Sequence, residues 1–93
     1  MSVANDQILN ALTIDAKIFE LEHPAQYADI VNHFGDDQVV VGVQAALAND
    51  ADYTKLVAET DAEVSLANLA TMLLPFFTKI IGTIIGGGAI AGL

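Results

Sequence analysis

Apolar residues near the start of the chain recur three and four positions apart, which is the spacing of one face of a helix. Two such stripes are present: Leu9, Leu12, Ala16 and Phe19, and then Ala11, Ile14, Ile18 and Leu21. Since successive helical residues are about 100° apart, the stripes lie on nearly opposite sides, and polar residues such as Asp15 and Glu22 fill the gaps between them. The pattern predicts a helix over residues 5–22, capped by Ser2 or Asn5. We expect one stripe to form a core contact with the protein's own short helices. We expect the other stripe to contact a partner in an oligomer.

Turn signals divide the next part of the chain into short helices. His23-Pro24 predicts the end of the first helix, because the residue before a proline avoids the helical region. A second short helix is predicted over residues 24–33, with Gly35 just beyond its end. Asp36 or Asp37 is then expected to cap the following segment.

The run Val39-Val40-Val41-Gly42-Val43 has the propensity of a strand. One apolar run without a partner strand makes a poor sheet, and residues 44–47 continue as a helix. We therefore predict a helix over residues 39–48. Asn49-Asp50 indicates another turn and cap, followed by a short helix to about Ala58.

The last third of the chain is almost entirely apolar. Thr60-Asp61-Ala62-Glu63 has the form of a capping box, which predicts that a long helix begins at about Asp61. If residues 64–93 were all helical they would reach about 45 Å, whereas a hydrocarbon core needs about 20 residues. The sequence therefore predicts a transmembrane or membrane-embedded helix, whose rival is a soluble oligomer that buries the same helix in a protein core.

Lys79 is the one charged residue of this segment. We expect it to be an intramembrane charge that faces a lumen, pairs with an acid from a neighbour's head, or extends its amine to the interface. Small residues spaced for close helix packing follow Lys79 toward the C-terminus. They form two pairs four residues apart: Gly82 with Gly86, and Gly88 with Gly92.

Composition and charge divide the chain in the same place. Hydrophobic residues make up 54% of the 93 residues, and mean hydropathy is +0.52. Twelve acidic residues oppose three lysines, for a net charge of −9, and every acid lies between Asp6 and Glu63. We therefore divide the chain into an acidic helical head, residues 1–60, and an apolar glycine-rich segment, residues 61–93. So acidic a protein is a poor ligand for a phosphate backbone, which disfavours nucleic acid as a partner.

Residues that could carry catalysis are sparse. His23 and His33 lie ten residues apart, which does not place two metal ligands on one helical face. Ser2 and Ser65 lie in no nucleophile motif, and the chain has no cysteine. We expect no enzymatic activity, cofactor or metal site. Residues 1–6 also lack the basic start and apolar run of a secretory signal peptide.

Acidic amphipathic helices followed by an apolar, small-residue-rich helix resemble, in layout, the small coat and membrane proteins of bacteriophages. The chain departs from the filamentous-phage coat proteins at residues 86–93, where glycines replace their lysine cluster. The resemblance implies a structural protein of a virion membrane, which anchors a lipid layer to a protein shell. Its partners would be the lipid bilayer, further copies of itself and other structural proteins of the assembly. The alternative function is a pore-forming protein of holin or toxin type.

Overall fold

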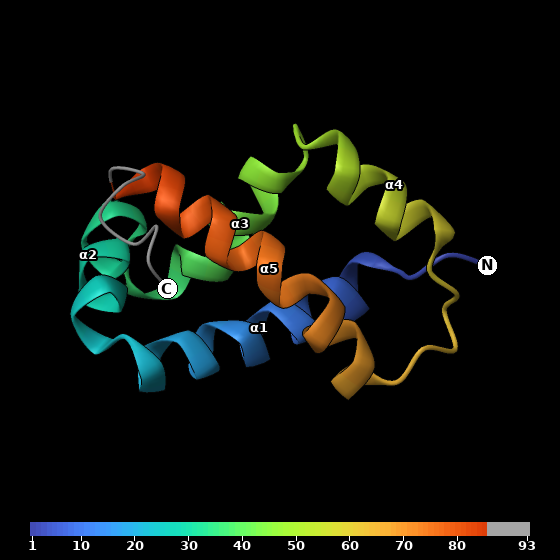
Figure 1. Cartoon of the computed structure of the whole chain (residues 1–93), viewed down its shortest axis with the longest axis horizontal. Helices are drawn as coiled ribbons and strands as arrows, with labels where there is room; N and C mark the ends of the chain where they lie inside the picture. The colour runs from blue at the N-terminus through green and yellow to red at the C-terminus, as the bar shows by residue number, and fades with distance from the viewer. Residues whose placement is uncertain (86–93) are drawn as a thin grey trace.

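The computed structural model describes residues 1–85, and these residues form helices joined by short turns (Figure 1). The predicted all-α class is confirmed for this part of the chain. The elements, in order, are α1 (Asn5–Glu22), α2 (Pro24–Phe34), the 3-10 turn η1 (Asp36–Gln38), α3 (Val39–Leu47), α4 (Ala51–Glu59) and α5 (Leu66–Ile84).

The bounds of α1 agree with the periodicity, but its cap does not. The N-cap is Ala4, whose backbone N–H donates to the Oε1 atom of Gln7 at 2.8 Å, so the predicted caps Ser2 and Asn5 are both wrong. A glutamine at the third helical position replaces the cap side chain by reaching back to the chain before the helix. At the other end, the backbone N–H of His23 donates to the Phe19 carbonyl at 2.7 Å, and Pro24 begins α2.

The turn between α2 and α3 depends on a glycine. Gly35 has a φ of 93°, a conformation that favours glycine, and it ends α2 as predicted. Asp36 and Asp37 lie inside η1 and do not cap α3, which corrects the expected cap. The valine run is helical, as predicted, because Val39, Val43 and Leu47 repeat every four residues and are all buried.

The start of α5 differs from the prediction. The helix begins at Leu66, and the Oγ atom of Ser65 caps it by accepting a hydrogen bond from the Asn68 N–H at 3.1 Å. Thr60 makes no cap there, because its hydroxyl donates back to the Leu56 carbonyl of α4 at 2.7 Å. A side-chain carboxylate of Asp61 instead accepts the Glu63 N–H at 2.8 Å, which closes a turn between the two helices.

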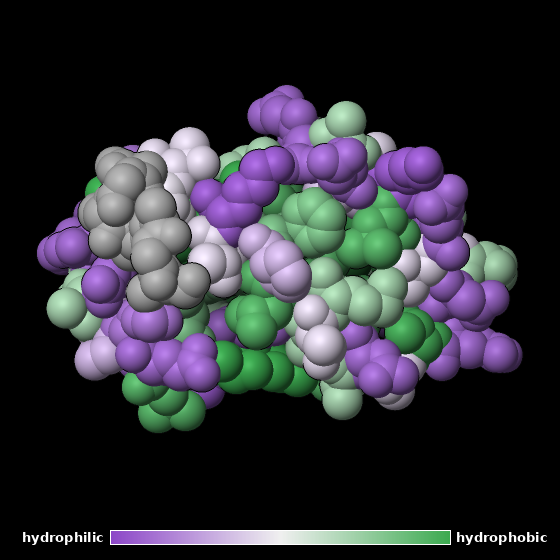
Figure 2. Space-filling model, in the orientation of Figure 1, coloured by the Kyte–Doolittle hydropathy of each residue, from purple (hydrophilic) through white to green (hydrophobic). Residues whose placement is uncertain are grey.

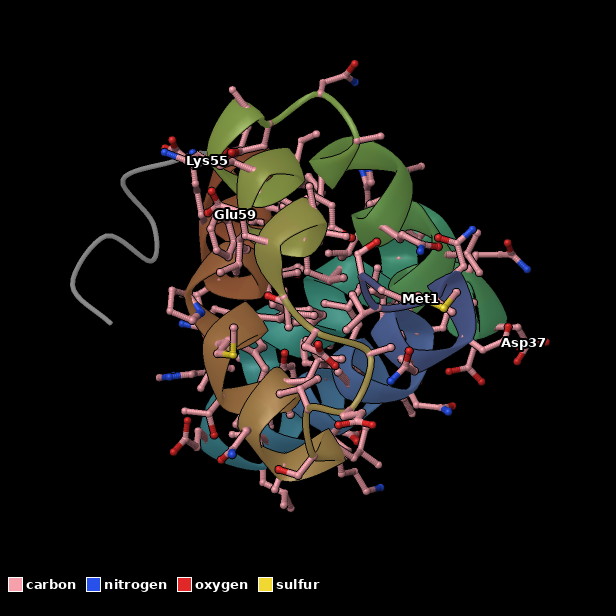
Figure 3. The ribbon with its side chains drawn as sticks, turned by 90° about the vertical axis from the view of Figure 1, so that its right-hand side faces the viewer. Met1, Asp37, Lys55 and Glu59 are labelled. Carbon is pink, nitrogen blue, oxygen red and sulfur yellow. The ribbon has the colours of Figure 1, made fainter. Side chains whose placement is uncertain are left out.

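The N-terminal residues fasten this turn to the rest of the molecule. The Val3 N–H donates to the Thr60 carbonyl at 3.1 Å, and the Ala62 N–H donates to the Met1 carbonyl at 2.7 Å. The side-chain amide of Gln7 donates to the Ala62 carbonyl at 2.7 Å. In the end-on view of Figure 3, Met1 lies beside this turn, while Lys55 and Glu59 project from α4 toward solvent.

A single hydrophobic core joins both predicted parts of the chain. The predicted boundary at residues 60 and 61 falls in the turn between α4 and α5, yet α5 lies across α1 and makes its largest contact there (Figure 1). The largest side chains with almost no exposed surface come from the head and α5 alike: Leu12, Ile30, Val43, Leu47, Leu69, Leu73, Phe77 and Ile81. The head and α5 therefore fold together.

Candidate functional site: the groove between α1 and α5

The two stripes of α1 have different environments. In the first, Leu12, Ala16 and Phe19 are buried in the core and Leu9 is half-buried. The Phe19 ring also packs against Phe77 of α5, with ring centroids 5.9 Å apart.

The second stripe changes along its length. Ala11 is buried, Ile14 and Ile18 are half-buried, and Leu21 is 76% exposed. The second stripe is thus covered only in part by the protein's own helices. Its most exposed residue, Leu21, lies at the C-terminal end of α1.

A groove with a volume of about 530 Å³ lies between α1 and the N-terminal half of α5. Hydrophobic side chains gather along the lower edge of the molecule in Figure 2, where α1 meets the N-terminal half of α5. The groove is lined from α1 by Ile14, Asp15 and Ile18, and from α5 by Leu66, Ala67, Ala70, Thr71 and Leu74. Its volume lies within the range of small-molecule sites, about 300–1,000 Å³.

Asp15 is the one ionisable residue of this lining. Its side chain has no exposed surface, and neither carboxylate oxygen has a hydrogen-bond partner within residues 1–85. The hydroxyl of Thr71 does not serve it, because that group donates to the Ala67 carbonyl at 2.9 Å. Burial raises the pKa of the Asp15 carboxyl from 3.8 to about 7. The periodicity of α1 predicts that Asp15 lies in a polar gap between the stripes, but the structure buries it, which corrects that expectation.

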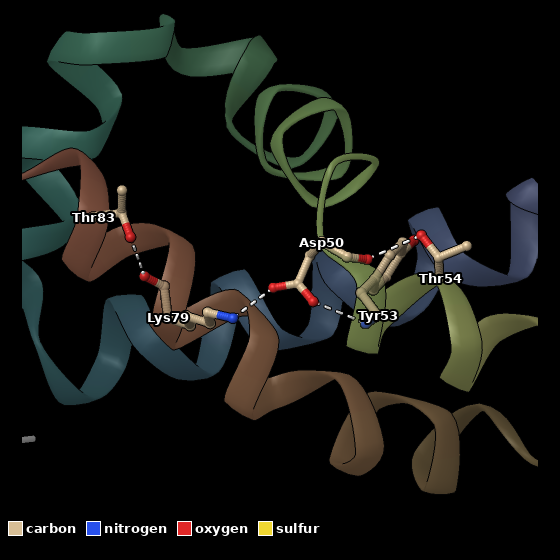
Figure 4. Close-up of polar contacts among 5 residues, drawn as sticks. All are labelled: Asp50, Tyr53, Thr54, Lys79 and Thr83. Atoms are coloured by element: carbon tan, nitrogen blue, oxygen red, sulfur yellow. Dashed lines mark hydrogen bonds and ion pairs between the residues drawn. The ribbon is translucent and has the colours of Figure 1, made fainter.

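A second carboxylate near α5, that of Asp50, accepts hydrogen bonds at both of its oxygens, in contrast to Asp15 (Figure 4). Asp50 caps α4 by accepting the Tyr53 N–H at 3.0 Å, and its other oxygen accepts from the Lys79 amine at 2.6 Å. These hydrogen bonds, the one from Lys79 first, lower the pKa of Asp50, and the carboxylate raises the pKa of Lys79. Lys79 of α5 is therefore paired within its own chain, with Asp50 of the head.

The outer and inner faces of α5 differ sharply. Leu69, Leu73 and Phe77 are buried on the inner face, whereas Leu66 is 46% exposed and Leu74 half-buried on the groove side. By length and composition alone, the 19 residues of α5 suffice to cross a membrane.

The predicted helix-packing glycines are only partly within the structure. Gly82 is half-buried in α5, and Gly86, Gly88 and Gly92 lie outside the described residues. The close packing expected of these pairs stays a prediction.

The two histidines pack against aromatic rings. The His23 ring lies 5.1 Å from the Phe19 ring, and the His33 ring lies 4.8 Å from that of Phe34, centroid to centroid. Within residues 1–85 no group of three acidic or histidine side chains could hold a metal ion. Among the described residues, the groove between α1 and α5 is the candidate site that combines the volume of a small-molecule site with an unsatisfied polar group.

Comparisons with known proteins find no family model, curated protein or solved structure that matches this chain.

Proposed function

We propose that this is a non-enzymatic structural and assembly protein that binds a lipid bilayer through α5 and the apolar residues after it. The observation that carries the proposal is α5 itself, a 19-residue helix long and apolar enough to cross a hydrocarbon core. The sequence beyond α5 adds only glycine, alanine, isoleucine and leucine, and therefore no further charged side chain.

The charge distribution supports a two-sided role for the protein. All acidic side chains precede Val64, so the acidic residues are separate in the sequence from α5 and the apolar residues after it. We propose that the acidic head contacts other structural proteins or further copies of this chain, and that the setting is a virion membrane. Recovery of the protein at fixed stoichiometry from purified particles would support this setting, and its absence from them would contradict it.

The buried face of α5 determines how the helix reaches lipid. Leu73, Phe77 and Ile81 have no exposed surface, so a spanning orientation requires α5 to leave α1. Such a departure would uncover the core side chains of α1, including Leu12 and Phe19, and would need an alternative partner for them. Contact through the groove side of α5 leaves the core intact, and we propose it as the first mode of membrane binding.

Flotation with vesicles of zwitterionic phosphatidylcholine tests the proposal with the intact protein. Zwitterionic lipid is the suitable probe because the net charge of −9 repels an anionic surface. We expect the wild type to float with the vesicles and Leu74→Asp to float much less, since an acid in the middle of α5 opposes burial in hydrocarbon. Val41→Asp is the matched control, because Val41 is an exposed apolar residue of α3.

Equal flotation of both variants, with helical circular dichroism retained, would contradict a role for α5. Failure of the wild type to float would contradict the membrane proposal as a whole. Leakage of a dye trapped in the vesicles at low protein-to-lipid ratio would instead identify a pore-forming protein.

A soluble helical oligomer is the second candidate function. The burial of Leu73, Phe77 and Ile81 inside the protein's own core favours it, because one face of the long apolar helix α5 already has a dry environment. Size-exclusion chromatography without detergent distinguishes the two. A defined lipid-free particle that does not float with vesicles would establish the oligomer.

A further inference from the structure

Asp15 lies in the contact that holds α5 on the rest of the protein. Its side chain has no exposed surface, and neither of its oxygens accepts a hydrogen bond within residues 1–85. The residues around it come from α1 and from the N-terminal half of α5, so the carboxyl is buried between the two helices. Buried polar groups in folded proteins are nearly always paired, so an orphaned carboxyl at the largest contact of the fold calls for a specific explanation.

No lysine faces Asp15 from α1 or from the helices packed on it. The one ionisable residue of α5 is Lys79, whose amine pairs with Asp50, and α3 has none. On α1 itself, Glu22 lies on the same side as Asp15, about 10 Å further along the axis, and Lys17 lies on the opposite side. The other ionisable residues of α1, of α2 and of the junction between them are Asp6, Glu20, His23, Tyr27, Asp29 and His33. None of these groups contributes to the pKa of Asp15, which burial raises.

Ionisation of Asp15 therefore favours a state in which α5 has left α1, because the carboxylate is then hydrated. The pKa of the docked carboxyl is about 7 and its ordinary value is 3.8, so the docked state loses stability as pH rises from about 4 to about 7. A difference of about three pKa units can shift the equilibrium by about a thousandfold. Little else that is polar holds α5 in place. Within residues 1–85, the exposed ion pair of Lys79 and Asp50 is the one side-chain bond that links α5 to another helix.

The apolar side chains of α5 determine whether ionisation alone releases it. Four large side chains of its inner face are buried: Leu69, Leu73, Phe77 and Ile81. Each of them favours the docked state by about tenfold to a hundredfold. Together they outweigh the ionisation of one carboxyl, so α5 stays docked in water. A bilayer changes this balance, because it offers the same side chains a second apolar environment.

We propose that Asp15 is a pH-sensitive switch: its ionisation releases α5 from α1 when a bilayer is present, and the inner face of α5 then enters the hydrocarbon. The inference rests on the membrane function proposed above and adds the condition for a spanning orientation, since contact through the groove side of α5 leaves Asp15 buried. The direction of the pH dependence is diagnostic. General protonation of the acidic residues makes the chain less charged and favours insertion at low pH, whereas the switch favours insertion at neutral pH.

Two spin labels report whether α5 remains docked. The chain has no cysteine, so Thr13→Cys on α1 and Thr83→Cys on α5 provide two unique sites, and both residues are exposed. Double electron–electron resonance gives the distribution of distances between the labels, in buffer and with phosphatidylcholine vesicles. In buffer we expect the docked distance at both pH 5 and pH 7. With vesicles, the ratio of a longer population to the docked one should rise by about fiftyfold between pH 5 and pH 7 and then level off.

Two substitutions at Asp15 and one control separate the switch from other titrations. Asp15→Asn keeps the shape of the side chain but does not ionise, so its distance distribution should be the same at pH 5 and pH 7. Asp15→Leu should be equally independent of pH, and it buries no polar group, which keeps the test valid if the asparagine variant fails to fold. Asp29→Asn is the matched control, because Asp29 is an exposed acid of α2, and it should keep the wild-type dependence on pH.

Flotation of the same samples distinguishes failure of the switch from failure of the membrane function. The wild-type pH dependence in Asp15→Asn or Asp15→Leu would overturn the switch. A longer population that is constant, or that grows as pH falls, would overturn it as well. Flotation with the docked distance alone would also overturn the switch and would leave the membrane function intact. A wild type that floats at neither pH would contradict the membrane function and the switch together.

Discussion

The carboxylates of Asp50 and Asp15 both lie near α5, but their pKa values shift in opposite directions. Asp50 caps α4 and holds Lys79 at 2.6 Å, so its charged form is stabilised and its pKa is lowered. Asp15 is buried beside α5 and has no hydrogen-bond partner within residues 1–85, so burial destabilises its charged form and raises its pKa to about 7. The two pKa values therefore shift in opposite directions near the same helix, because burial dominates at Asp15 and hydrogen bonds to Lys79 and Tyr53 dominate at Asp50.

This comparison depends on the contact between α1 and α5, which Phe77 secures. Phe77→Ala removes a ring with no exposed surface that packs against Phe19, and we expect a loss of about 3–5 kcal/mol in the free energy of unfolding. Urea denaturation followed by circular dichroism measures it. A loss below about 1 kcal/mol would mean that α5 does not dock on α1 in solution.

Ionisation of Asp15 should have the next largest effect on the free energy of unfolding. Because its folded-state pKa lies above the ordinary 3.8, the protein gains most from this group at low pH and loses that stability as pH rises from about 4 to about 7. Asp15→Leu removes the ionisation, so above pH 7 it should exceed the wild type by about 2–4 kcal/mol in free energy of unfolding.

The pH dependence is the decisive part of that measurement. The advantage of Asp15→Leu should shrink as pH falls toward 4, where the wild-type carboxyl is protonated in both folded and unfolded chains. Unfolding curves for both proteins across this range provide the check. An advantage that does not vary with pH would show that Asp15 titrates normally.

A substitution between α2 and α3, at a position with no ionisable group, shows whether the pH dependence comes from Asp15. A Cβ atom at Gly42 of α3 would overlap the ring of Phe34 from α2, so Gly42→Ala should lower the free energy of unfolding by about 1–3 kcal/mol. The loss should be the same at pH 5 and pH 8, since neither side chain ionises. A loss that varied with pH as Asp15→Leu does would contradict the local origin of that effect.

The pair of Asp50 and Lys79 should have the smallest effect, because the lysine side chain is 57% exposed and water screens the interaction. Lys79→Met should destabilise the protein slightly at neutral pH and low salt. Since the pKa of Asp50 is lowered, the loss should disappear as pH falls below the ordinary value of 3.8 and Asp50 becomes protonated. Lys55→Met, at an exposed lysine of α4, is the control and should show no such dependence on pH.

The helices of this fold could be predicted because their determinants are local. The spacing of apolar residues predicts α1, and Pro24 and Gly35 set the bounds of α2. The valine run of α3 is the instructive case, since its propensity favours a strand but its buried residues repeat every four positions. The capping box at Thr60 was misleading, because a threonine hydroxyl can also bond back to the preceding helix, as it does to Leu56.

The candidate site could not be predicted in the same way, because its parts are distant in the sequence. Asp15 lies between two apolar stripes, and nothing near it indicates that a helix from the other end of the chain will cover it. Asp50 and Lys79 are 29 residues apart, so the sequence allowed a paired lysine but could not name its partner. Local periodicity assigns a residue to a face of its helix, and long-range packing decides what covers that face.

The docking of α5 on α1 also has a consequence for biosynthesis. The ribosome makes α1 first and α5 last among the described helices, so the largest contact of the fold joins the two ends of this region. Until α5 emerges, Leu12 and Phe19 have no partner from that helix, and the nascent chain exposes their hydrophobic surface. Such a chain completes this fold only after α5 has emerged, and until then a chaperone, a membrane or a second copy can compete with α5 for the same surface.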